Sequence, residues 1–221
     1  MKTEIKSRPI LFSGEMVRAI LDGRKTRTRR IVKPQPEAWS HDTVGYELAM
    51  PECRPLYPES FCKAYCKLGE VGDRLWVRET CRAEELPSGL DGVRYAADDA
   101  FREIENTELA SDLWSDLFSY ANARGKNVPS IHMPRWASRI TLEITGVRVE
   151  RLNDISEADA IAEGVESQLS GSDIVFRNYK KGQQGWTQVA RYSFEWLWES
   201  INGPGSWAAN PWVWVVEFKR V

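Results

Sequence analysis

The segment from Trp212 to Lys219 constrains the fold more than any other part of the sequence. Side chains alternate between the two faces of a strand. One face of this segment carries Trp212, Trp214, Val216 and Phe218. The opposite face begins with Val213 and Val215, so both faces are apolar over most of its length. We therefore expect a wide, largely buried strand.

Tryptophan is the most frequent aromatic residue, with 10 Trp against 7 Tyr and 7 Phe in 221 residues. Most of the ten lie near the C-terminus, where helix and strand periods place Trp198, Trp212 and Trp214 on apolar faces. We expect these residues to form core. Trp76 and Trp136 remain the candidates for stacking on a nucleobase.

Composition describes a globular chain, with 42% hydrophobic and 28% charged residues, and excludes disordered and collagenous classes. The length fits one large domain, residues 1–221, with insertions. No apolar run approaches the roughly 18 residues of a membrane span, and the N-terminus lacks the apolar stretch of a signal peptide. We therefore expect a cytoplasmic protein without a membrane partner.

The formal net charge of −2 conceals a strong asymmetry. Residues 1–33 hold ten basic and three acidic side chains, a net of +7, and residues 84–116 hold ten acidic and two basic, a net of −8. A basic N-terminal region is the usual footprint of a phosphate-bearing partner. Two alternatives stay open: the acidic segment folds onto the basic one, or both are solvated surfaces.

The cysteines raise the question of a zinc site. They are Cys53, Cys62, Cys66 and Cys81. Structural zinc usually takes paired ligands about two to four residues apart, and only Cys62 and Cys66 have that spacing. Neither histidine, His41 or His132, has ligand-like neighbours. We favour four reduced thiols over zinc and expect no metal and no cofactor.

The first third of the chain predicts a strand, a helix and a second strand. Pro9 to Phe12 is a short apolar strand, Ser13 is a helix N-cap candidate, and Gly23 fits the left-handed position that ends a helix. Thr26 to Val32 is a basic, β-branched strand that ends at two prolines. Beyond it, residues 34–71 are proline-rich without a clear period and are interpreted as a long loop or insertion.

The strand predicted from Arg74 to Glu79 has an unusual face. Leu75 and Val77 share one side, while Arg74, Trp76 and Arg78 share the other. A cation–aromatic–cation surface can stack a base and hold a phosphate. The alternative is that Trp76 packs beneath an inserted segment. Such an insertion is expected over the acidic residues 84–130, with a helix near residues 109–122.

The remaining segments complete an α+β pattern. Residues 137–152 predict a strand whose apolar parity shifts across Gly146, which is typical of a β-bulge that bends a sheet towards a barrel. Ser156 to Glu163 predicts a short helix, with Asp159 as a capping-box acid. Residues 166–186 predict a flexible loop, and residues 194–201 an amphipathic helix. Together these elements predict an α+β domain with a small bent barrel of about five or six strands.

Familiar catalytic motifs are missing, among them the phosphate loop, the zinc-protease helix and the nucleophile elbow. The segment with the most candidate functional side chains is basic and contains Arg24, Lys25, Arg27, Arg29 and Arg30. Neighbouring cations lower the pKa of a lysine, so Lys25 could act as a base towards a threonine hydroxyl. From spacing alone, an anion-binding or solvated face is the favoured interpretation.

The sequence resembles ASCH domains, which are relatives of the PUA RNA-binding barrel. Four blocks occur in the family's order: Gly23–Arg30, Gly72–Val77, Ile155–Gly164 and Val215–Lys219. With Ser130–Arg139, the whole chain looks like the longer ASCH proteins of bacteriophages and prophages. The resemblance implies a PUA-like barrel that recognises RNA, a nucleotide or a modified nucleobase.

The smallest bacterial members of this superfamily are amidohydrolases that deacetylate N(4)-acetylcytidine. Matched residue by residue, their catalytic groups fall on Lys25 as base, Thr28 as nucleophile and Glu163 as an orienting or proton-shuttling carboxylate. Backbone amides would then stabilise the oxyanion.

Two classes of function therefore stay open. A binding module for RNA, a nucleoside or a nucleotide would use Arg24, Arg27, Arg29, Arg74, Trp76 and Arg78, with an affinity that falls as salt rises. An amidohydrolase would use Lys25, Thr28 and Glu163. Turnover separates the two classes, because Lys25→Ala would abolish deacetylation by an enzyme and only weaken binding by a binder.

Overall fold

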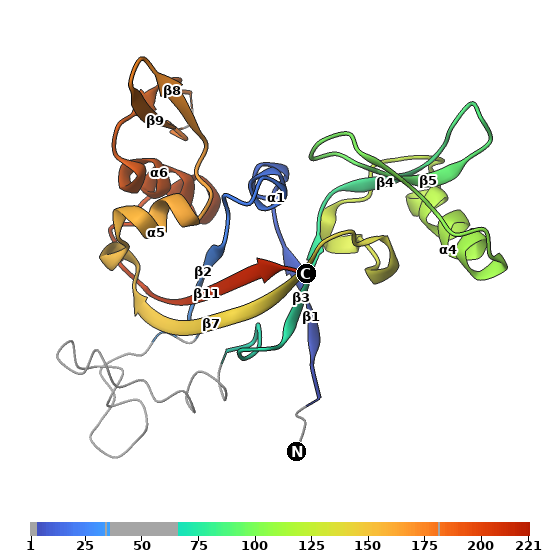
Figure 1. Cartoon of the computed structure of the whole chain (residues 1–221), viewed down its shortest axis with the longest axis horizontal. Helices are drawn as coiled ribbons and strands as arrows, with labels where there is room; N and C mark the ends of the chain where they lie inside the picture. Colours follow the sequence, from blue (N-terminus) through green and yellow to red (C-terminus); the bar gives the residue numbers. More distant parts are fainter. Residues whose placement is uncertain (1–3, 34, 36–65, 181) are drawn as a thin grey trace.

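The structure is a computed structural model that describes residues 4–33, 35, 66–180 and 182–221. Its centre is a five-stranded sheet with the strand order β1-β3-β7-β11-β2 (Figure 1). The strands are β1 (Ser7–Leu11), β2 (Arg27–Ile31), β3 (Arg74–Arg78), β7 (Thr141–Arg151) and β11 (Trp212–Arg220). β1 runs parallel to β3, and the other neighbours are antiparallel.

The apolar strand near the C-terminus is confirmed as a buried strand. β11 lies between β7 and β2, and its two faces belong to two different hydrophobic cores. The first core takes Trp212, Trp214, Val216 and Phe218. The second core takes Val213 and Val215. Burial on both faces explains why the sequence of this strand is apolar at successive positions.

The expected bulge at Gly146 is also confirmed. The register between β7 and β11 shifts between Glu217, which pairs with Gly146, and Phe218, which pairs with Ile144. A Cβ at Gly146 would lie 3.0 Å from the Glu217 carboxylate, so a side chain at this position would crowd the neighbouring strand. The two long strands bend together across the molecule (Figure 1).

The predicted small barrel is wrong, because the sheet is open. Within the described residues, the end strands β1 and β2 do not pair with each other. Helix α1 (Gly14–Leu21) connects them and packs Val17 and Ile20 into the first core. Arg30 of β2 reaches across to the Leu11 carbonyl of β1 with a 2.9 Å hydrogen bond. The fold is therefore a mixed α+β domain whose sheet edges are bridged by a helix and a side chain.

The two short helices next to β2 begin and end as the sequence predicts. The Ser13 side chain accepts a main-chain N–H at 3.4 Å at the start of α1, and Gly23 follows its end with φ +75°. The Ser156 side chain does the same at 3.0 Å for α5 (Glu157–Ala162), and Gly164 follows with φ +85°. Each glycine occupies the left-handed region that favours this residue type.

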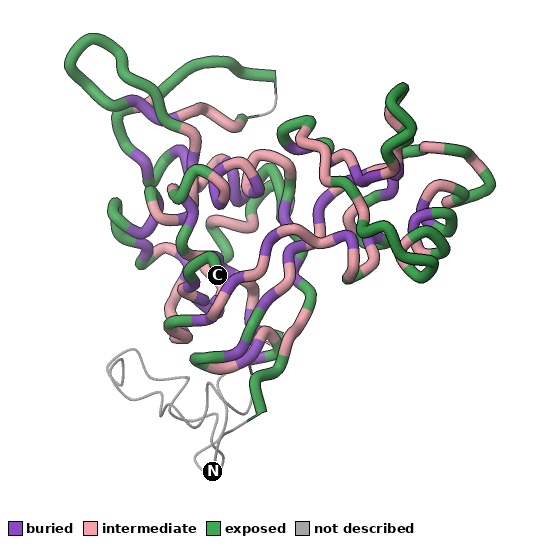
Figure 2. Tube along the Cα trace, turned by 45° about the vertical axis from the view of Figure 1, so that its right-hand side comes forward, coloured by how far each residue is buried: buried purple, intermediate pink, exposed green. Residues whose placement is uncertain are grey.

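Residues 166–186, expected to be a flexible loop, form a second sheet instead. Its strands are β8 (Ser167–Ser170), β9 (Asp173–Arg177) and β10 (Trp186–Thr187). Phe176 of β9 is buried in the second core with Phe194 of α6 (Ala190–Asn202), which anchors the hairpin, whereas β8 is exposed along its whole length. Figure 2 shows the outer end of this hairpin as exposed.

The acidic region builds a third unit on the opposite side of the molecule (Figure 1). It contains β4 (Cys81–Glu85), β5 (Asp91–Tyr95), β6 (Phe101–Glu103) and α4 (Glu108–Phe118). The helix expected near residues 109–122 is therefore confirmed in its first part, and a 3-10 turn, Tyr120–Asn122, follows it. Other 3-10 turns cover Ser130–His132, Arg135–Ala137 and Leu152–Asp154. The unit has its own core, which includes Val93, Trp114 and Met133.

Most of the proline-rich insertion expected at residues 34–71 lies outside the described residues. In the part of the chain that the structure describes, no helix is long and apolar enough to cross a membrane.

Candidate functional site

Lys25 is a buried lysine, only 2% exposed, in the turn between α1 and β2. Its Nζ donates to the Arg27 carbonyl at 2.8 Å, the Glu163 carbonyl at 2.8 Å and the Glu163 Oε2 at 2.9 Å. An ammonium has three N–H donors, so all of them are used. Burial lowers the pKa of Lys25 below its ordinary value, and the Glu163 carboxylate acts against that shift.

Glu163 reaches Lys25 because α5 ends against it. Glu163 is the C-cap residue of α5 and is 4% exposed. A Cβ on the following residue, Gly164, would lie 2.7 Å from the Lys25 Cβ and 2.9 Å from the Ala19 Cβ. The glycine therefore permits both the left-handed backbone and the close approach of the two segments.

Arg29 connects Glu163 to a larger buried ion network. Its guanidinium has no solvent exposure and donates to Glu163 at 3.0 Å, to Asp159 at 3.0 Å and to Glu150. Three carboxylates around one arginine compensate the loss of its hydration. The network fixes α5 on the face of the sheet that carries Arg29.

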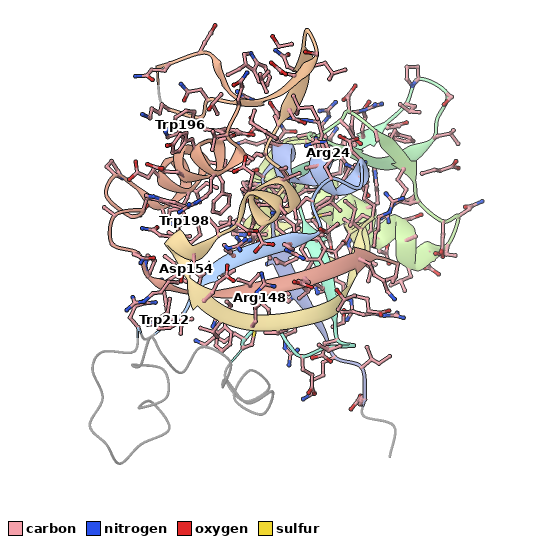
Figure 3. All side chains as sticks on the ribbon, turned by 60° about the vertical axis from the view of Figure 1, so that its left-hand side comes forward. Arg24, Arg148, Asp154, Trp196, Trp198 and Trp212 are labelled. Carbon is pink, nitrogen blue, oxygen red and sulfur yellow. The ribbon has the colours of Figure 1, made fainter. Side chains whose placement is uncertain are left out.

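The outer part of this network involves two further arginines. Arg148 of β7 contacts Glu150, Asp159 and Glu217, and Arg27 contacts Asp159 and Glu217. Figure 3 shows Arg148 on the bent strand beneath α5. The Asp159 carboxylate, expected to complete a capping box, instead binds arginines of the sheet.

A cavity of about 60 Å³ lies at the free edge of β2, between α1 and α6. Its wall includes Thr28, Arg30, Glu163, Phe194, Leu197 and Trp198. Thr28 is 1% exposed, and within the described residues no hydrogen bond joins its hydroxyl to Lys25. Glu163 is the group that connects the two, because it binds Lys25 and also lines the cavity with Thr28.

Arg30 is the cavity residue that the sequence analysis did not select. Its guanidinium donates to the carbonyls of Leu11 and Arg29 at 2.9 and 3.3 Å, and it lies 5.5 Å from the centroid of the Phe12 ring. Within the described residues, no carboxylate forms an ion pair with it. Burial lowers the pKa of Arg30, and Glu163 opposes the shift, but an arginine remains a cation at neutral pH. The only sequence signal was its position in the basic segment.

The arginines predicted to contact ligand in this segment bind protein groups. Arg27 and Arg29 belong to the ion network, and Arg24 donates to Asp22 at 3.0 Å and to the Gly164 carbonyl at 3.4 Å. In the described residues, the ion pairs of this segment use no carboxylate from residues 84–116. The acidic partners come instead from α5, β7, β11 and the adjacent Asp22.

The second predicted binding surface lies around β3. Arg74 and Trp76 line an open hollow of about 300 Å³ together with Arg135, and in the described residues neither arginine forms an ion pair. Arg78 is directed elsewhere, because it donates to the Met133 carbonyl at 3.1 Å and to the Ile131 carbonyl, with its guanidinium 5.4 Å from the Trp76 ring. Trp136 packs against the third core.

The structure describes two of the four cysteines. Cys66 and Cys81 are buried free thiols, and burial raises the pKa of both, that of Cys81 to about 12. Cys53 and Cys62 lie outside the described residues. Among the described residues, no group of three or more His, Cys, Asp or Glu side chains is placed to hold a metal ion.

Comparison of the chain with family models, with curated proteins and with solved structures finds no match.

Proposed function

We propose that the protein is an ASCH-like module that recognises a nucleobase, as a free nucleoside, a nucleotide or part of an RNA, in the cavity at the edge of β2. The observation that carries the proposal is Arg30, a cation without a carboxylate partner among the described residues, which lines the same cavity as apolar side chains of α6. A flat heterocycle needs apolar walls and a few placed polar groups. Thr28 and Glu163 add oxygen acceptors to the donors of Arg30.

The proposal requires the cavity to open. A volume of about 60 Å³ holds a few water molecules at most, so a nucleobase must displace side chains on the solvent side. Met16 and Ile201 line that region, and Ile201 is 56% exposed. Met16 is half-buried against the first core, and neither side chain belongs to the ion network, so their movement leaves that network in place.

The hollow around Trp76 supports RNA as the ligand. Its exposed Arg74 and Arg135 would meet phosphates while the Trp76 ring stacks on a base. Because phosphate contacts release counterions, RNA binding should weaken as salt rises, whereas binding of an uncharged nucleoside should not.

Calorimetric titration with cytidine, N(4)-acetylcytidine and a short single-stranded RNA tests this function. Arg30→Gln should weaken nucleoside binding by about tenfold or more, because a charged donor contributes roughly 1.5–3 kcal/mol. The exposed Arg220 of β11, changed to Gln, is the matched control and should leave binding unchanged. Absence of binding by the wild-type protein, or equal binding by Arg30→Gln, would contradict the proposal.

A second function, amide hydrolysis, is favoured by one specific arrangement. Glu163 binds Lys25 at 2.9 Å and lines the same cavity as Thr28. Lys25 can accept a proton only after losing one, and Glu163 is placed to take it. Burial favours the neutral amine, and apo geometry is often looser than that of a substrate complex.

The chemistry of this second function balances as an acyl transfer to Thr28 and then to water. The Thr28 oxygen would add to the acyl carbon while Lys25 takes the hydroxyl proton. The C–N bond then breaks as that proton passes to the leaving amine. Water next cleaves the threonine ester and releases the acid.

Chromatographic assay of N(4)-acetylcytidine tests turnover. The enzyme hypothesis predicts cytidine and acetate from the wild-type protein and loss of activity in Lys25→Ala, Thr28→Val and Glu163→Gln. Binding without cytidine formation would leave recognition as the function and exclude hydrolysis of this substrate.

A further inference from the structure

The third unit has an open groove of about 330 Å³ between the end of β6 and α4. Its apolar lining includes Ile104, Leu113 and Trp136, which are all half-buried. Ile104 and Trp136 also pack against the core of the unit, so that core reaches the surface here. Leu109 of α4 extends the apolar lining outwards and is 69% exposed. Exposed apolar surface with a polar rim is typical of interaction sites.

Both sides of this groove are acidic. Glu103 and Glu105 line it on the β6 side and are exposed. On α4, Asp112 and Asp116 are exposed and lie three and seven positions after Leu109, which places all three on one side of the helix. Within the part of the chain that the structure describes, none of these four carboxylates forms an ion pair.

A second hollow, of about 230 Å³, adjoins the groove and shares Glu103, Ile104 and Glu105 with it. Asp91 of β5 also lines this hollow, and its Oδ1 is buried without a hydrogen-bond partner among the described residues. A buried carboxylate oxygen without a donor is unfavourable. The group that would satisfy it is a donor, and the neighbouring carboxylates favour one that carries a positive charge.

Arg102 does not supply that donor. It lines the groove, but its guanidinium donates to the carbonyls of Ser138 at 3.1 Å and Trp136 at 2.8 Å. Among the described residues, it is also the only cation in the lining of either hollow. The surface therefore stays acidic, in keeping with the net charge of −8 over residues 84–116.

We infer that this groove binds a basic peptide segment of a partner protein, with an apolar side chain in the groove and a lysine or arginine in the hollow beside Asp91. The apolar anchor supplies affinity, and charge complementarity selects a cationic partner. The acidic rim would repel the phosphates of a nucleic acid. The inference is independent of the proposed function, because the groove shares no residue with the cavity at the edge of β2 and lies in the unit on the other side of the sheet (Figure 1).

A yeast-displayed library of random short peptides, selected against the full-length protein, tests the inference. Enriched peptides should combine Lys or Arg with a large apolar residue. Fluorescence polarisation of a labelled enriched peptide then measures its affinity, which should fall as salt rises because the charges on the rim are exposed.

Charge reversal at the rim is the first test of where the peptide binds. Glu103→Lys combined with Glu105→Lys should weaken binding at least about tenfold, because like charges would then face each other. The matched control is Glu4→Lys combined with Asp173→Lys, which changes the net charge equally at exposed positions outside the third unit. The control should bind the peptide as the wild-type protein does.

Removal of the apolar anchor is the second test. Leu109→Ser should weaken binding at least about fivefold, as for an anchor at an interface. Leu169→Ser is its control, since Leu169 of β8 is 74% exposed and lies outside the third unit. All the substituted side chains are exposed, so urea unfolding should find each variant as stable as the wild-type protein.

Three results would overturn the inference. The first is enrichment of acidic peptides or of no peptide. The second is equal binding of the enriched peptide by the wild-type protein and both groove variants. The third is a wild-type dimer in sedimentation velocity that Leu109→Ser converts to a monomer, because the occupant would then be a second copy of the chain. Peptide binding at the groove without any nucleoside binding would remove the proposed function and leave this inference standing.

Discussion

At the scale of single residues, Lys25 and Glu163 depend on each other. They lie 138 positions apart in the sequence, and both are buried. Removing one partner of a buried pair leaves the other charge without compensation, which typically destabilises a protein by about 3–5 kcal/mol. An exposed pair contributes roughly 0–1 kcal/mol.

Glu163→Gln should therefore lower the free energy of unfolding by about 3 kcal/mol, because the buried Lys25 and Arg29 both lose the carboxylate that they share. Urea denaturation measures the change. Glu143→Gln is the control, since Glu143 pairs at 2.9 Å with Lys219, whose side chain is 59% exposed. Equal effects of the two substitutions would show that the Lys25–Glu163 pair is not buried.

The lowered pKa of Lys25 predicts a pH dependence of stability. Between that pKa and the ordinary lysine value, about 10.4, the unfolded chain binds the proton and the folded protein does not. Raising the pH through this window therefore stabilises the fold. The free energy of unfolding of the wild-type protein should rise relative to Lys25→Met in alkaline buffers, and parallel curves would argue against the lowered pKa.

At the scale of elements, strand parity divides the basic segment. Arg27 and Arg29 lie on the α5 side of β2 and meet carboxylates, whereas Thr28 and Arg30 lie on the other face. The carboxylates that pair with Arg27 and Arg29 are more than a hundred residues away in the sequence. The basic segment alone therefore does not reveal which of its arginines lacks an ion pair. Lys25 precedes β2, so the alternation of side chains along the strand does not determine its direction.

An element can be predicted from sequence when its own residues carry the pattern that stabilises it, and not when contacts with distant residues stabilise it. β11 could be predicted because its own side chains alternate between two apolar faces. The hairpin of β8 and β9 could not, because β8 is exposed along its whole length and the anchor in β9, Phe176, packs against α6. Pairing of that kind depends on distant residues and leaves no local period.

The end of α5 offers a matched pair of glycine substitutions. Gly23 and Gly164 follow helices with φ +75° and +85°, but a Cβ at Gly23 meets nothing within 4 Å. Both changes to Ala should incur the left-handed penalty of about 1–2 kcal/mol. Gly164→Ala should cost about 1–3 kcal/mol more in urea denaturation, because its Cβ displaces the Lys25 stem. Equal losses would contradict this packing.

At the scale of the whole molecule, an ion cluster fastens the third unit to the central sheet. Arg139, just before β7, binds Glu79 after β3 and Asp98 between β5 and β6 at 2.8–2.9 Å. The hydrogen bonds from Arg139 hold the pKa of Asp98 below its usual range. A carboxylate of this kind stabilises the fold above its unfolded pKa and loses the effect as pH falls.

Asp98→Asn should therefore destabilise the protein near neutral pH and make little difference in acid. The gap in free energy of unfolding between the two proteins should shrink as the pH falls below about 3.9, the ordinary pKa of an aspartate. Urea denaturation of both proteins, from pH 6 down to the lowest pH at which the wild-type protein is still folded, measures this difference in free energy of unfolding. A gap that is constant with pH would mean that the Asp98 charge does not contribute.

The α+β class could be predicted because strands and helices alternate clearly in the sequence. Barrel closure could not, since it depends on whether β1 and β2 meet, and α1 with Arg30 occupies their junction. For the candidate site, the resemblance brought Lys25 and Glu163 together as the structure does. The cavity at the edge of β2 depends on tertiary packing alone, because its walls come from α1, β2 and α6.

The most direct test of the account is a crystal structure of the protein soaked with N(4)-acetylcytidine. We predict difference density for the base at the edge of β2, in contact with Arg30. Density for the base against Trp76, with the β2 cavity closed, would contradict the central claim.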